Sequence, residues 1–244
     1  MKNYVCSILY FFCLFLVSCG SINDQVTELD EATTIDNNLP EKESILKILS
    51  LGDSYTIGQS VCETCRFPNQ LKDSLQKQLS INTSLELEII AQTGWTTSNL
   101  IEAIKDKNIT EDYNLVTLLI GVNNQYTNKD FSIYKSEFPQ LVNTSIKAVN
   151  NIKDKLIVVS IPDYAFTPFG KGNKTISKEI DLYNNFAEEY CRENNITFVN
   201  ITDITREGLS NSSLIANDNL HPSKLAYTKF VERILPFALK KIAN

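Results

Sequence analysis

The only histidine of this 244-residue chain, His221, follows an aspartate, Asp218, by three residues. A neutral imidazole can take the proton from a serine hydroxyl, which is a poor nucleophile until a base does so. A carboxylate on the far ring nitrogen fixes the imidazole tautomer and stabilises the cation that forms. Because a turn before Pro222 can fold the carboxylate back onto the ring, this pair predicts a general base and the acid that orients it.

Ser54, in the stretch GDSYT, is the candidate nucleophile. Attack on a carbonyl carbon creates a negatively charged oxygen that needs hydrogen-bond donors directed at it. The backbone N–H groups of Ser54 and Gly94 and the side-chain amide of Asn123 are of the right type, and a glycine lets the backbone approach a substrate closely. Taken singly, each of these residues also fits an ordinary turn, and a lone histidine is more often structural.

The elements that must position these residues alternate along the chain. Apolar runs predict five strands, and four-residue apolar spacing or capping residues predict helices between them. The strands are expected near 45–54, 85–91, 115–121, 155–162 and 196–201, and the helices near 68–79, 98–106, 132–152, 178–194 and after residue 222. The run at 115–121 is continuously apolar, which indicates a parallel strand covered on both faces.

This alternation predicts a three-layer α/β/α sandwich with a mainly five-stranded parallel sheet. Ligands of such folds bind beyond the carboxyl ends of the strands. Ser54, Gly94 and Asn123 each follow a predicted strand, and the Asp218–His221 pair lies in the last loop before the closing helix. We therefore expect all of them at one edge of the sheet.

Together, GDSYT, Gly94, the stretch GVNN and the spaced pair Asp218 and His221 resemble the sequence blocks of the SGNH, or GDSL-type, hydrolases. The resemblance covers residues 45–244 and implies a flavodoxin-like α/β/α fold and a serine ester hydrolase. It assigns Ser54, Asp218 and His221 to a catalytic triad, and Ser54, Gly94 and Asn123 to the oxyanion hole. No metal or organic cofactor is implied.

The resemblance leaves the substrate open among short-chain esters, thioesters, lysophospholipids and acetylated sugars. Four aromatic residues on the predicted active-edge loops are candidates for an acyl or sugar pocket, or for simple packing: Trp95, Tyr126, Phe166 and Phe169. One departure is Asn124, where these hydrolases usually have aspartate. It spares the oxyanion donor and puts the supporting hydrogen bonds in doubt.

Cys62 and Cys65, in the stretch CETC, support a rival function. Two cysteines at this spacing between a strand and a helix could form the redox pair of a thioredoxin-like oxidoreductase. That reading leaves Ser54, Asn123 and the Asp218–His221 pair unexplained. In an exported protein a structural disulfide is the simpler alternative, and a zinc site is the least favoured. A third class is a binding lipoprotein with an inactive hydrolase fold.

The N-terminus indicates export. Lys2 is followed by an apolar run too short for a comfortable membrane span, and the run ends at Cys19 and Gly20. This end resembles a bacterial lipobox, which implies a signal peptide at 1–18 and a lipid on Cys19. An ordinary signal peptide with an incidental cysteine is the alternative. The expected location is the periplasmic or cell-surface side of a membrane.

Residues 19–43 are expected to be an acidic tether and residues 44–244 the hydrolase domain. Residues 20–43 hold seven acidic residues and one lysine, which accounts for the net charge of −6 of the whole chain. The domain itself is almost neutral, so its charge gives no case for binding nucleic acid. The expected partners are an acyl ester of a small molecule, carbohydrate or lipid, and the membrane that holds the anchor.

Overall fold

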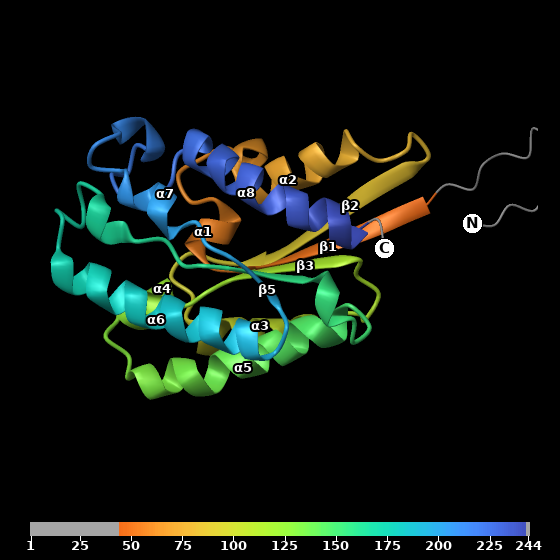
Figure 1. Ribbon diagram of the computed structural model, residues 1–244, viewed down its shortest axis with the longest axis horizontal. Helices are drawn as coiled ribbons and strands as arrows, with labels where there is room; N and C mark the ends of the chain where they lie inside the picture. The colour runs from red at the N-terminus through yellow and green to blue at the C-terminus, as the bar shows by residue number, and fades with distance from the viewer. Residues whose placement is uncertain (1–43, 243–244) are drawn as a thin grey trace, which may run out of the picture. The chain divides into compact units, whose positions relative to one another are not determined.

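The computed structural model describes residues 44–242, so the predicted signal peptide, the lipidated Cys19 and the tether lie outside the described residues. A central sheet is covered by helices on both faces (Figure 1). Within residues 44–242, none of the helices has the length and apolar character required to cross a membrane.

Five strands form the sheet in the order β2-β1-β3-β4-β5, and every pair is parallel. Their bounds are β1 Ser44–Gly52, β2 Thr83–Ala91, β3 Leu115–Leu119, β4 Leu156–Val159 and β5 Thr197–Val199. This confirms the predicted α/β/α class and the parallel sheet. Within residues 44–242, no strand of the sheet runs antiparallel, unlike the hairpin expected of a thioredoxin fold. The order reverses direction between β1 and β3, which is where ligands bind in open α/β sheets.

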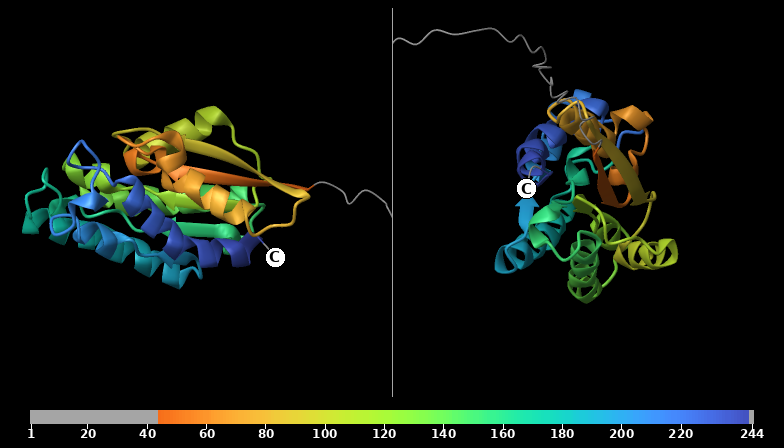
Figure 2. Two further views of the ribbon diagram at one scale, coloured as in Figure 1. Left: turned by 90° about the horizontal axis from the view of Figure 1, so that it is seen from above. Right: turned by 90° about the vertical axis from the view of Figure 1, so that its right-hand side faces the viewer.

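Helices α2 and α8 lie together over one face of the sheet, and α3, α5 and α6 cover the other (Figures 1 and 2). The long helices are α2 Phe67–Gln76, α3 Thr97–Lys107, α5 Phe131–Ala148, α6 Lys174–Glu193 and α8 Lys224–Ile242. The short helices are α1 Ser54–Ile57, α4 Val122–Tyr126 and α7 Thr202–Arg206, with 3₁₀ turns η1 Glu63–Cys65, η2 Lys153–Lys155, η3 Tyr164–Phe166 and η4 Ser212–Leu214.

The core lies between the sheet and each helix layer. All five residues of β3 are buried, as predicted for a strand covered on both faces, and the one polar residue among them, Thr117, donates its hydroxyl to Ser50 Oγ. Leu71 and Leu75 of α2 are completely buried at the spacing that predicted this helix. On α6, Cys191 is the free cysteine of the described residues and is fully buried. Burial raises the pKa of its thiol to about 12.

Helix α5 ends earlier than its sequence predicted. The expected range extended to residue 152, whereas the helix stops at Ala148. Asn150 and Asn151 have φ angles of 53° and 62°, in the left-handed region that asparagine tolerates better than most residues. Their backbone conformation turns the chain toward β4.

Candidate active site

Ser54 is the first residue of α1, directly after the turn from β1. The buried carboxylate of Asp53 accepts a 3.0 Å hydrogen bond from the Tyr55 N–H and so caps α1. At Gly52, a Cβ would lie 2.1 Å from Thr56 Oγ1 and 2.4 Å from the Leu119 carbonyl oxygen. The glycine therefore lets β1 enter this turn, and the turn presents Ser54. Burial raises the pKa of Asp53 to about 7.

Asp218 and His221 are in direct contact. Asp218 Oδ2 lies 2.6 Å from His221 Nδ1, and Asp218 Oδ1 accepts hydrogen bonds from the backbone N–H groups of Leu220 and His221 at 3.0 and 2.9 Å. Partial burial alone would raise the pKa of Asp218. Hydrogen bonds from the Ser60 side chain, from the His221 backbone and side chain, and from the Leu220 backbone outweigh burial and lower the pKa to about 2. An ionised carboxylate therefore faces the imidazole.

Gly94 and Asn123 come to the same edge of the sheet from β2 and β3. Gly94 has a φ of 84°, and a Cβ built on it would meet no atom within 4 Å. Its backbone therefore needs glycine for its conformation and faces open space. Asn123 Nδ2 donates a 2.9 Å hydrogen bond to the Trp95 carbonyl, which joins the two connections. Gly94 and Asn123 both line one pocket, which Ser54 also lines.

Asn124, the departure from the usual sequence, is hydrogen-bonded in both directions. Its Oδ1 accepts from the Thr97 N–H at 3.0 Å, and its Nδ2 donates to Thr97 Oγ1 at 2.6 Å. The Thr97 hydroxyl in turn donates to the Glu137 carboxylate. Because that hydroxyl proton is already engaged, the residue at 124 must be a donor toward it, and an ionised aspartate has no proton to give. The asparagine therefore keeps both hydrogen bonds that join α4 to Thr97, the first residue of α3.

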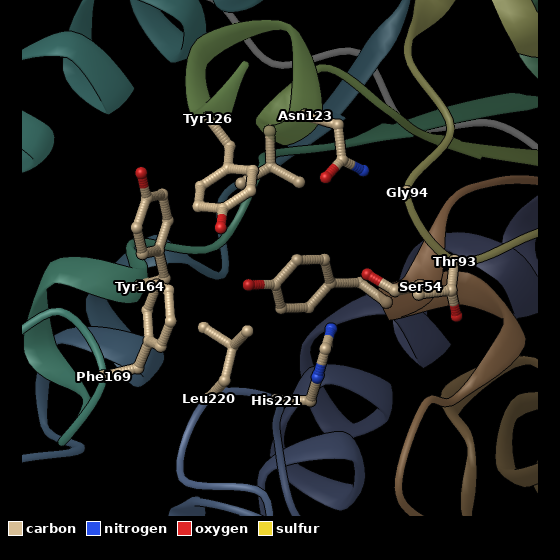
Figure 3. Close-up of a pocket in the computed structure, with 11 residues that line it drawn as sticks. Ser54, Thr93, Gly94, Asn123, Tyr126, Tyr164, Phe169, Leu220 and His221 are labelled. Carbon is tan, nitrogen blue, oxygen red and sulfur yellow. The ribbon is translucent and has the colours of Figure 1, made fainter.

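The predicted residues converge on one pocket of about 210 Å³. Ser54, Gly94, Asn123 and His221 all line it, and Figure 3 shows them around a common space. The Tyr55 ring lies 5.2 Å from the His221 ring. Within residues 44–242 no hydrogen bond joins the Ser54 hydroxyl to His221, and such contacts are often long before a substrate binds.

An aromatic wall forms the far side of the pocket from Ser54 (Figure 3). It consists of Tyr126, Tyr164 and Phe169, whose ring centroids are 6.0 to 6.3 Å apart. Trp95 and Phe166, also expected at this edge, do not line the pocket and are half-buried. Trp95 packs against the core instead, and its carbonyl is what reaches the site.

Sequence reasoning missed five pocket residues and one neighbour. The five that line the pocket are Tyr55, Thr93, Val122, Tyr164 and Leu220. The neighbour is Ser60, which donates a 2.6 Å hydrogen bond to Asp218 Oδ2. Adjacency to Ser54 and His221 is a signal that could have identified Tyr55 and Leu220. Ser60 lies 158 residues from Asp218, and no local pattern points to that contact.

Comparison with known families decides the assignment. Residues 50–229 match the GDSL-like Lipase/Acylhydrolase family, which is more than half of the chain. The chain belongs to this family. A GDSL-like acylhydrolase is an enzyme that hydrolyses ester bonds, and this hydrolase carries its candidate site at the strand ends where the resemblance placed it. A comparison with curated proteins finds no match.

Solved structures share the fold of this GDSL-like hydrolase. The psychrotrophic esterase EstA from Pseudoalteromonas sp. is 19% identical with a TM-score of 0.57, over 81% of this chain and 99% of that chain. A family 3 carbohydrate esterase from Clostridium thermocellum is 18% identical with a TM-score of 0.61, over 82% and 98%. LAE5, an α/β hydrolase enzyme from the Lake Arreo metagenome, is 16% identical with a TM-score of 0.61, over 80% and 96%. At these identities the likeness concerns the fold alone.

Proposed function

We propose that the chain is a serine esterase with Ser54 as nucleophile, His221 as general base and then acid, and Asp218 as the residue that orients His221. The observation that carries this proposal is the convergence of Ser54, Gly94, Asn123 and His221 on one pocket. The 2.6 Å contact between Asp218 and His221 Nδ1 supports it, because it leaves Nε2 for the serine proton.

The reaction proceeds in two steps. Ser54 Oγ bonds to the ester carbonyl carbon as His221 takes its proton, and the carbonyl oxygen becomes an oxyanion. Ser54 N–H, Gly94 N–H and Asn123 Nδ2 donate to that oxyanion. The C–O bond to the alcohol breaks, and His221 gives its proton to the alcohol. Water then attacks the acyl-enzyme with His221 again as base, which releases the carboxylic acid and restores Ser54.

Asn123→Ala is expected to lower kcat by on the order of 10²-fold, the usual scale for one lost oxyanion donor. KM should change little, because the amide stabilises charge that develops only in the transition state. Steady-state kinetics on one good ester substrate measure both constants. A loss confined to KM would show that Asn123 holds the bound ester and is not an oxyanion donor.

The substrate is proposed to be an uncharged ester with an apolar group of modest size. None of the residues that line the pocket is Asp, Glu, Lys or Arg, and the far wall is aromatic. The volume of about 210 Å³ lies below the roughly 300–1,000 Å³ of pockets that enclose drug-sized ligands. It therefore suits a short or medium acyl chain, or a single ring, better than a long fatty chain.

A panel of esters tests this proposal together with Phe169→Ala. With acetyl, butyryl, hexanoyl and palmitoyl esters of one alcohol, kcat/KM is expected to peak at butyryl or hexanoyl. Phe169 is 48% exposed, so removing its half-buried ring should lower the hexanoyl value about 5- to 10-fold and leave the acetyl value nearly unchanged. Phe237→Ala is the matched control, because Phe237 is 45% exposed on α8 and does not line the pocket.

The results of the same panel can contradict the proposed substrate class and the proposed esterase activity separately. Fastest turnover of the acetyl ester, with no gain from longer acyl chains, would reject the apolar group and keep the esterase. An equal loss on all esters in Phe169→Ala would reject the wall as a specificity element. No turnover of any ester by folded protein would contradict catalysis and favour a binding protein.

Membrane anchoring through Cys19 is proposed from the sequence alone. The apolar run that ends at Cys19 is typical of a bacterial lipoprotein signal, and the acidic stretch at 20–43 would serve as the tether. Cys19→Ala is expected to move the protein from the membrane fraction to the soluble fraction or to stall its processing. Fractionation of cells that express each form measures this, and unchanged membrane partitioning would contradict the lipid anchor.

A further inference from the structure

The loop at residues 58–65, between α1 and α2, contacts three separate parts of the candidate site. The Gln59 N–H donates to the Ser54 carbonyl at 2.9 Å, and Gln59 Oε1 accepts from Thr93 Oγ1, next to Gly94, at 2.6 Å. Ser60 Oγ donates to Asp218 Oδ2 at 2.6 Å. Neither Gln59 nor Ser60 lines the pocket. The 58–65 loop therefore connects the catalytic elements without facing the substrate space.

The Ser60 contact falls on the atom of Asp218 that orients the histidine. Asp218 Oδ2 receives both the Ser60 hydroxyl and His221 Nδ1, each at 2.6 Å. Among the described residues, the hydrogen bonds to Oδ1 come from the backbone of Leu220 and His221, within three residues of Asp218 itself. Ser60 is thus the donor that fixes this carboxylate relative to β1 and α1, the elements that carry Ser54.

The 58–65 loop is held in a strained conformation. Ser60 has a φ of 66°, which costs a non-glycine residue about 1 kcal/mol or more. Two residues after it begins the Cys62–Cys65 disulfide, which joins the N-cap and the last residue of η1. Arg66 closes the far end through its hydrogen bonds to the Ile57 carbonyl and to Glu63. A disulfide this close to Ser60 can hold that residue in its left-handed conformation.

We propose that Ser60 is a positioning residue for Asp218 and that the Cys62–Cys65 disulfide holds Ser60 against it. The inference rests on the proposed function, in which Asp218 orients His221. It assigns the CETC stretch a supporting role in esterase turnover: the disulfide is not a redox catalyst, and its loss slows the hydrolysis.

Two substitutions at Ser60 separate the hydroxyl from the backbone. Ser60→Gly suits the left-handed conformation and removes the hydroxyl, whereas Ser60→Thr keeps a hydroxyl and strains the backbone. If the hydroxyl positions Asp218, Ser60→Gly lowers kcat about 3- to 10-fold, the value of one hydrogen bond to a partly exposed charged group, with KM unchanged. Ser60→Thr should stay within about 2-fold of wild-type kcat although its Tm is lower.

Asn150→Gly is the control, because it places glycine at another exposed left-handed position. Asn150 lies in the turn before β4, at the amino ends of the strands, and the candidate site lies at their carboxyl ends. It should leave kcat and KM unchanged. If the variant with the higher Tm also had the higher kcat, so that Ser60→Gly was more active than Ser60→Thr, the role of the hydroxyl would be overturned. Full wild-type kcat in Ser60→Gly overturns it even if Ser60→Thr does not fold.

Reduction tests the disulfide. Dithiothreitol supplies two electrons and two protons, so Cys62 and Cys65 become thiols and the reagent closes to its own cyclic disulfide. After anaerobic removal of the reagent, with reduction checked by mass, wild-type kcat should fall by the same factor as in Ser60→Gly. Reduced Ser60→Gly should fall no further, because the contact is already lost. Full activity of reduced wild type, or a further fall in reduced Ser60→Gly, overturns the role of the disulfide.

Asp218→Asn distinguishes failure of the inference from failure of the proposed function. A collapse of kcat in Asp218→Asn with normal kcat in Ser60→Gly rejects the inference alone. Normal kcat in Asp218→Asn rejects the triad itself, and with it the role of Ser60.

Discussion

Ser54→Ala is expected to lower kcat/KM by on the order of 10⁴- to 10⁶-fold while the protein stays folded. The methyl group cannot form the acyl bond, and any remaining rate would come from the oxyanion donors and from binding alone. The Ser54 hydroxyl makes no hydrogen bond within the described residues, so its removal should shift Tm little. The measurement is ester hydrolysis by purified variant, with Tm followed by circular dichroism.

Ser136→Ala is the matched control, because Ser136 is exposed on α5, on a helix that only covers the sheet. It should behave as wild type in both assays. Substantial turnover by Ser54→Ala, in a preparation free of contaminating esterase, would reject Ser54 as the nucleophile. If Tm fell by a large amount, misfolding could account for the loss of activity. Detection of an acyl group on Ser54 of the wild-type protein by mass spectrometry would then decide whether Ser54 is the nucleophile.

His221→Ala should lose nearly as much turnover as Ser54→Ala, and the double variant should be scarcely worse. The two groups act as one unit, since a base without its nucleophile and a nucleophile without its base are both ineffective. Asp218→Asn should cost on the order of 10²- to 10⁴-fold, because an amide favours the wrong imidazole tautomer. Single-substrate kinetics of the four variants measure this. Additive losses in the double variant would contradict a shared mechanism.

The lowered pKa of Asp218 fixes the sign of its pH dependence. Its folded pKa of about 2 lies below the roughly 3.9 of an unfolded aspartate, so its hydrogen bonds stabilise the folded state above about pH 4. That contribution is lost as the pH falls toward 2. Around neutral pH the carboxylate stays ionised, so Asp218→Asn should be impaired at every pH of an ordinary assay.

The sheet could be predicted because its information is local. The residues of β3 are apolar apart from Thr117 and favour burial on both faces, and the alternation of such runs with helices leaves few topologies. Ser54, Gly94 and Asn123 each follow a strand, so the parallel sheet brings them to one edge whatever the details of packing. The predicted fold class was therefore enough to predict where the candidate site lies.

The rest depends on contacts that no local pattern contains. A serine at a φ of 66° is an unfavourable choice, so nothing in the sequence announces the turn at Ser60 or its bond to Asp218. The sequence left Trp95 open between lining the pocket and simple packing, and only the tertiary contacts decide for packing against the core. The support that Asn124 gives was equally hidden, since it depends on how the Thr97 hydroxyl is already used.

The burial of Cys191 has a consequence for how the chain acquires its disulfide. Thiol–disulfide exchange requires a thiolate, and a thiol with a pKa of about 12 inside the core forms almost none at neutral pH. Cys62 and Cys65 are three positions apart, so they can pair without waiting for distant parts of the chain to fold. Once α6 has packed, the native pair has no competing sulfur among the described residues. After α6 has packed, the Cys62–Cys65 pairing should therefore not exchange with the sulfur of Cys191.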